Sequence, residues 1–120
     1  MNCIDQVESM AAKQADAKTM GEIRRLAADA GQVRLSKTTQ YDLMAHRLTK
    51  ADICDEIINW IDNGNPVKEV VLHSLQNLVG HPAYEIKPRM KGNLFYVKVT
   101  LVKLGQPDEY MLVVSAHPDH

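Results

Sequence analysis

The hydrophobic period of this chain changes at Pro66, and that change limits the fold more than any other feature. Before Pro66, apolar residues recur at the spacing of one helical face. After Pro66, apolar and polar residues alternate, as in strands that bury one side. Helices followed by strands are typical of an α+β protein. We therefore expect N-terminal helices packed on a C-terminal antiparallel β-sheet.

The N-terminal stretch is predicted to be helical. Residues 4–30 are rich in good helix formers and contain no proline. Gly21 is expected to break this stretch, so that a second helix opens at Thr19 or Met20. That second helix is expected to stop at Gly31, because glycine readily adopts the left-handed conformation that ends helices.

Two further helices and a short strand are expected before Pro66. Residues 32–35 alternate as a strand, and Ser36 is a typical N-cap for the helix that follows. Thr49 and Asp52 match a capping box at the start of a second helix. That helix is expected to end at Asn63-Gly64-Asn65-Pro66. After Pro66, the alternating pattern predicts strands over residues 67–72, 84–87, 93–104 and 110–116.

The 120 residues suit one domain, 1–120, in which residues 1–20 are expected to form a helical extension and residues 21–117 the core. No apolar run approaches the roughly 18 residues of a membrane span, and the N-terminus lacks a signal-peptide pattern. A cytoplasmic protein without membrane contact is therefore expected. Cys3 and Cys54 are too few for a disulfide framework or a zinc site, and no cofactor or metal is predicted. Dinucleotide, P-loop, zinc-protease and serine-hydrolase motifs are absent from the sequence.

Charge is distributed unevenly along the chain. The net charge is −1, but the stretch from Lys87 to Lys103 carries five basic residues and no acidic one. Such a stretch could bind a phosphate chain, or it could be an ordinary solvated strand face. Charge alone favours the solvated face.

Residues 93–104 place two kinds of side chain on opposite faces of one strand. Apolar residues from Phe95 to Leu101 share one face, whereas Tyr96 and Lys98 lie on the other. If the hairpin to the last strand is regular, Ser115 and His117 join that polar face. A β-bulge would change this register.

Tyrosine, lysine, arginine and histidine side chains on one face suit RNA cleavage without a metal. The ribose 2′-hydroxyl is a built-in nucleophile, so the protein must supply a general base and a general acid. Cations can stabilise the charge that develops on the phosphate. Histidine exchanges protons near neutral pH, and tyrosine can stack on a base or donate to phosphate.

Four segments occur in a recognisable order. They are Ala30-Gly31-Gln32-Val33-Arg34, Lys87-Pro88-Arg89, residues 92–101 (with Tyr96, Lys98 and Thr100), and Leu112-Val113-Val114-Ser115. In this order and spacing they resemble the MqsR toxins, which belong to the wider RelE-like endoribonuclease fold. The resemblance covers roughly residues 20–117.

The resemblance implies a set of site residues. Tyr96 would position the substrate or assist proton transfer, and Lys68 would stabilise the phosphate. Lys98, in the same strand motif as Tyr96, is a further candidate catalytic residue. His117 stands where the family has a lysine, which replaces a fixed cation with a titratable acid or base. The basic turn at Lys87, Arg89 and Lys91 would contact RNA, as would Tyr84. Because the family's glutamine before Pro-Arg has no counterpart here, a non-catalytic RNA- or protein-binding module on the same fold stays open.

The resemblance also implies partners and products. RNA is the expected substrate, and its cleavage would leave a 2′,3′-cyclic phosphate and a 5′-hydroxyl. A protein antitoxin is the expected partner of such an mRNA interferase in a bacterial toxin–antitoxin system. A homodimer stays open, and so does a role of residues 4–20 in binding another chain.

Overall fold

The structure is a computed structural model that describes residues 13–73 and 75–119. Its helices are α2 (Ala17–Ala27), α3 (Lys37–Ala45) and α4 (Lys50–Asp62), with short 3-10 turns η1 (Ala30–Gln32) and η2 (Gln76–Leu78). Its strands are β1 (Val33–Leu35), β2 (Lys68–Val71), β3 (Pro82–Ile86), β4 (Arg89–Met90), β5 (Asn93–Val102) and β6 (Tyr110–Pro118). The predicted α+β class is confirmed. Most of the predicted N-terminal extension lies outside the described residues.

The six strands form one sheet in the order β1-β6-β5-β3-β2, and β4 pairs with β5 at its end. Neighbours from β2 to β6 are antiparallel, as expected, but β1 runs parallel to β6. The strands after Pro66 are therefore antiparallel as predicted, and the sheet as a whole is mixed because β1 joins it in parallel. β1 precedes α3 and returns beside the last strand, where Val33 is buried in the core.

The beginning of α2 differs from the prediction. The Asp16 side chain accepts a hydrogen bond from the Thr19 backbone N–H at 2.8 Å, so the helix begins at Ala17. It continues through Gly21, where a Cβ would meet nothing within 4 Å. An exposed glycine costs a helix only about 1 kcal/mol, so Gly21 does not break it. Residues 13–15 are not helical, because they run beside β2 and exchange backbone hydrogen bonds with Val67 and Glu69.

The helices before Pro66 begin where their caps predict. The Ser36 hydroxyl accepts from the Thr39 backbone N–H and caps α3. Thr49 and Asp52 form the complete capping box of α4, each side chain accepting from the other residue's backbone N–H. Beyond α4, Gly64 adopts φ 78°, the left-handed conformation that ends the helix.

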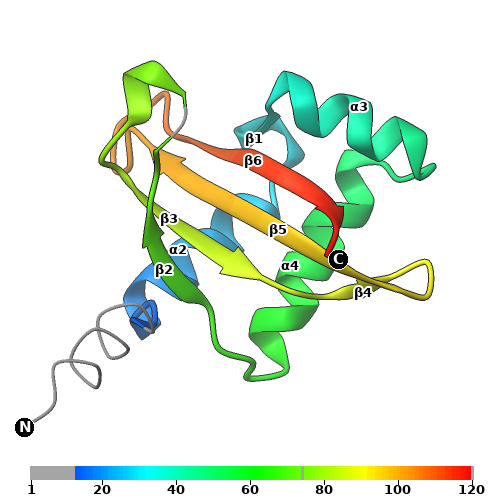
Figure 1. The fold of residues 1–120 in the computed structure, drawn as a ribbon. Helices are drawn as coiled ribbons and strands as arrows, with labels where there is room; N and C mark the ends of the chain where they lie inside the picture. Colours follow the sequence, from blue (N-terminus) through cyan, green and yellow to red (C-terminus); the bar gives the residue numbers. More distant parts are fainter. Residues whose placement is uncertain (1–12, 74, 120) are drawn as a thin grey trace, which may run out of the picture.

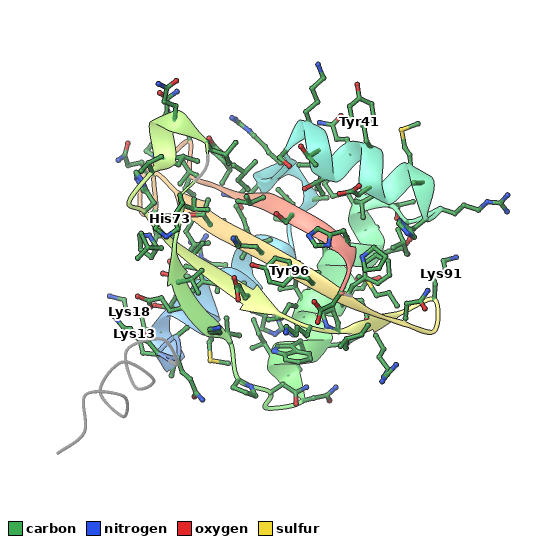
Figure 2. The ribbon with its side chains drawn as sticks, in the orientation of Figure 1. Lys13, Lys18, Tyr41, His73, Lys91 and Tyr96 are labelled. Carbon is green, nitrogen blue, oxygen red and sulfur yellow. The ribbon has the colours of Figure 1, made fainter. Side chains whose placement is uncertain are left out.

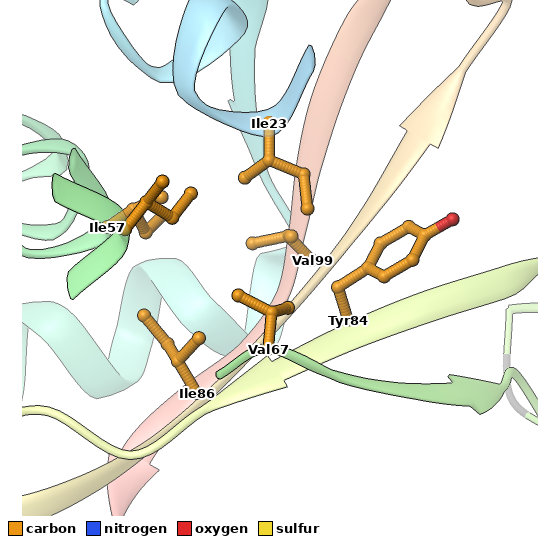
Figure 3. Close-up of a pocket in the computed structure, with 7 residues that line it drawn as sticks. Ile23, Ile57, Val67, Tyr84, Ile86 and Val99 are labelled. Atoms are coloured by element: carbon orange, nitrogen blue, oxygen red, sulfur yellow. The ribbon is translucent and has the colours of Figure 1, made fainter. Parts of the chain in front are cut away.

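The main core lies between the sheet and helices α2 and α4, which Figure 1 shows behind the sheet. Ile23 and Leu26 of α2 and Ile53 and Ile57 of α4 are buried against Phe95 and its neighbours in β5. A small apolar cavity of about 10 Å³ remains among these layers (Figure 3). Its lining is wholly apolar, since the Tyr84 hydroxyl points away from it (Figure 3), so it is a packing gap and offers no ligand site.

The opposite face of the sheet is called the open face, and it carries Lys68, Glu85, Tyr96, Lys98, Ser115 and His117. In Figure 1 this face points toward the viewer, and no helix of the described chain crosses it. α3 lies beside the β6 edge instead, where it packs on β6. Among the described residues, no helix combines the length and the apolar character needed to cross a membrane.

Candidate functional site on the open sheet face

Register places the predicted β5 and β6 side chains on one face. Tyr96 pairs with His117 and Lys98 pairs with Ser115, and residues paired across strands point to the same side. A bulge follows at once, between Lys98 and Val99 of β5, and Val114 is the extra residue on β6. The bulge lies beyond the site, so the expected alignment of the polar side chains holds.

The bulge does change the rest of β6. Regular alternation predicts Met111 and Val113 on the polar face, together with Ser115. Both are instead buried in the main core, because the extra residue reverses the alternation on the hairpin side of the bulge. Leu112 and Val114 therefore lie on the open face, where they pack on Leu72 and Ala83.

Tyr96 and His117 form the centre of the site. Their ring centroids are 5.4 Å apart and their planes are tilted by 35°. The Nδ1 atom of His117 is 3.0 Å from the Pro118 carbonyl oxygen, which can only accept, so this bond places a proton on Nδ1. The Nε2 atom is then the nitrogen left for a substrate.

Glu85 completes the site, although the sequence analysis did not select it. The Tyr96 hydroxyl donates a hydrogen bond to Glu85 Oε2, and Lys98 Nζ lies 3.9 Å from the same oxygen. Because Tyr84 and Ile86 point into the core, strand alternation predicts that the Glu85 side chain points to the opposite face of the sheet. Its proximity to Tyr96 depends on the β3–β5 register, which no local pattern gives.

The environment of Tyr96 determines its protonation. Burial raises the pKa of the phenol above its ordinary value, and the hydrogen bond to Glu85 raises this pKa further. The charge of Asp119 acts in the same direction. Tyr96 is therefore a protonated hydrogen-bond donor at neutral pH and is unsuited to act as a base.

Two further lysines surround this centre. Lys68 is the register partner of Glu85 on β2, so it lies on the open face and is exposed. Lys87 follows β3, and its Nζ lies 3.3 Å from Asp119 Oδ2 near the end of β6. Lys98 Nζ lies 5.6 Å from the Tyr96 ring centroid. The predicted residues Lys68, Tyr96, Lys98 and His117 thus come together from three strands (Figure 2 labels Tyr96 near the middle of this face).

Three other predicted residues lie elsewhere. Tyr84 is only 7% exposed and belongs to the core face of β3, where it shares the register of Ile86. Tyr84 was predicted to contact RNA, but alternation directs its side chain to the helices and not to the face of Tyr96, so its burial gives that contact no support. Arg89 and Lys91 line an open groove of about 340 Å³ beside α4, together with the carboxylates Asp52, Asp55 and Glu56. Figure 2 shows Lys91 at the hairpin tip, away from Tyr96.

The open face is apolar at its other end. Leu72, Ala83 and Val114 are buried there, with Val70, Leu78 and Leu112 packed around them. The polar and charged side chains of this face are thus concentrated at its opposite end, where β3, β5 and β6 carry Glu85, Tyr96 and His117.

Comparisons of the chain with protein-family models, curated proteins and solved structures found no match.

Proposed function

We propose that this chain is a metal-independent endoribonuclease of the RelE-like class, related to the MqsR toxins. The observation that carries the proposal is the convergence of Lys68, Tyr96, Lys98 and His117 on one open sheet face, from β2, β5 and β6. These four are the residues that the sequence predicts as catalytic, and His117 among them stands where the family has a lysine. RNA is the proposed substrate, a protein antitoxin the proposed partner and the cytoplasm the proposed location.

The proposed roles follow from the chemistry of each group. The 2′-hydroxyl attacks the adjacent phosphorus, the 5′-oxygen leaves, and the products carry a 2′,3′-cyclic phosphate and a 5′-hydroxyl. His117 exchanges a proton through Nε2. Tyr96 positions the substrate, and the ammonium groups of Lys98 and Lys68 stabilise the negative charge on the phosphate.

The test is incubation of the purified protein with a long unstructured RNA in EDTA, followed by chemical mapping of the new ends. We expect cyclic phosphate ends, and we expect Tyr96→Phe and His117→Ala each to lower the cleavage rate by roughly 100-fold or more. Tyr41→Phe and His73→Ala are matched controls, since both side chains are exposed and lie away from Tyr96 in Figure 2. Both controls should cleave normally.

If free RNA stays intact, the same assay is repeated with translating ribosomes. Intact RNA in both assays would contradict the proposal. Salt-sensitive RNA binding without cleavage would then favour the alternative, a non-catalytic binding module. Normal cleavage by Tyr96→Phe and His117→Ala would leave the activity standing but reject this site.

A further inference from the structure

Glu85 is a partly buried carboxylate in the middle of the site. It lies on the open face between Lys68 of β2 and Lys98 of β5. Its side chain is only 14% exposed, and that of Lys98 is 22% exposed. Partial burial of an ionised carboxylate costs free energy of folding unless the carboxylate is hydrogen-bonded or paired with a cation.

One hydrogen-bond donor and one ion-pair partner hold Glu85. Tyr96 donates its hydroxyl hydrogen to Oε2, and the Lys98 ammonium lies 3.9 Å from the same atom. Within the described residues both contacts use Oε2, which leaves the second carboxylate oxygen as an acceptor for a proton from outside. A carboxylate that is fixed by one oxygen and open at the other has the form of a general base.

Glu85 and His117 lie on two sides of β5. Tyr96, on β5, contacts Glu85 of β3 through its hydroxyl and His117 of β6 through its ring. A phosphate placed over Tyr96 would therefore have a carboxylate on one side and an imidazole on the other. Displacement at phosphorus needs this arrangement, because the attacking and leaving oxygens are roughly in line.

From this geometry we propose that Glu85 is the general base of the site and His117 its general acid, which rests on the proposed ribonuclease function. Glu85 takes the proton of the 2′-hydroxyl as its oxygen forms a bond to phosphorus. The bond from phosphorus to the 5′-oxygen breaks with its electron pair, and His117 Nε2 donates a proton to that oxygen. Tyr96 is then a positioning residue for Glu85, because its one hydroxyl hydrogen is donated to Oε2.

This assignment predicts a bell-shaped pH dependence of kcat/KM, because the base must be deprotonated and the acid protonated. Loss of Glu85 should remove the rising limb, and loss of His117 the falling limb. Several charged or titratable groups face Glu85 and contribute to its field: Lys68 on β2, Lys87 at the end of β3, Tyr96 and Lys98 on β5, and His117 and Asp119 at the end of β6.

The experiment compares Glu85→Gln and His117→Ala on two substrates with the same sequence. One is ordinary RNA, and the other carries sulfur in place of the bridging 5′-oxygen at the mapped cleavage site. A thiolate leaves without a proton, so the sulfur substrate needs the base but not the acid. Both variants should cleave ordinary RNA at least roughly 100-fold more slowly than the original protein. The sulfur substrate should restore His117→Ala to the rate of the original protein and leave Glu85→Gln slow.

Controls separate this inference from the proposed function. Glu69→Gln removes a carboxylate from the opposite face of β2 and should cleave normally with an unchanged pH profile. Circular dichroism and binding of 2′-O-methyl RNA show whether Glu85→Gln keeps its fold and its RNA affinity. If the original protein cleaves RNA but Glu85→Gln cleaves equally well, or gains on the sulfur substrate as His117→Ala does, Glu85 is not the base. If the original protein does not cleave RNA, free or on ribosomes, the proposed function fails, and this inference fails with it.

Discussion

At the scale of single residues, Tyr96 offers a direct measurement of the site's electrostatics. Its pKa is raised by burial and by the adjacent Glu85 carboxylate, so its phenol should remain protonated when the pH passes the ordinary tyrosine value of about 10. NMR of the ring carbon bonded to oxygen can follow this titration in labelled protein. Glu85→Gln should lower the pKa of Tyr96, because the hydrogen-bonded anion is gone. Glu69→Gln should leave the titration of Tyr96 unchanged, and an equal decrease in both variants would contradict the contact.

The same scale shows what the sequence could reveal about the site. Tyr96, Lys98 and His117 were predicted to share a face because strand alternation is local and the hairpin between β5 and β6 is short. Tyr84 was assigned to RNA although its alternation with Ile86 already indicated the core. Glu85 was missed because its contact with Tyr96 joins β3 to β5 and depends on a register that only the assembled sheet defines.

At the scale of elements, the first turn of α3 holds the bulge of β6. The Thr39 hydroxyl donates to the Val113 carbonyl at 3.1 Å, and the Ser36 hydroxyl donates to the Val114 carbonyl at 2.9 Å. Thr39 is fully buried. These bonds satisfy carbonyl groups at the point where the bulge disturbs the ladder, so the bulge is a built feature of the sheet.

Thr39→Val should therefore lower the free energy of unfolding by about 1 kcal/mol at almost constant volume, because it removes one of two hydrogen bonds to the Val113 carbonyl, which also accepts from the Ser36 backbone N–H. Urea unfolding followed by circular dichroism measures this change. Thr38→Val is the matched control, since Thr38 is exposed in the same helix turn and its effect should stay within about 0.5 kcal/mol. Equal losses in both variants would mean that the lower helix propensity of valine, not the bond to β6, causes the effect.

Elements were predictable from sequence where their signals are local. The caps of α3 and α4 are short-range hydrogen bonds, and both helices begin where Ser36 and Thr49 indicate. β1 was recognised as a strand, but its parallel pairing with β6 joins residues nearly eighty positions apart. The extended path of residues 13–15 was missed for the same reason, since it is set by pairing with β2.

At the scale of the whole molecule, one face of the sheet forms the core and the other carries the proposed site. One face is covered by α2 and α4 and forms the main core, while no helix of residues 13–73 or 75–119 covers the polar end of the other (Figure 1). The net charge of −1 gives no overall attraction to RNA, so any affinity must come from local cations. Lys68 lies on the open face, whereas Lys91 lines a groove that also contains Asp52, Asp55 and Glu56.

The salt dependence of RNA binding tests whether RNA contacts Lys68 on the open face more than Lys91 in the groove. Each phosphate contact to a single strand contributes about 0.7 to the slope of log affinity against log salt concentration. Lys68→Gln should lower that slope by about this amount for 2′-O-methyl RNA, which cannot be cleaved through its 2′-position. Lys91→Gln should lower it less, because the carboxylates of its groove already offset part of its charge. Lys18→Gln, which changes an exposed side chain of α2, should leave the slope unchanged. If Lys18 and Lys91 alter the slope as much as Lys68 does, RNA is not bound along the open face, and the proposed site would have to move.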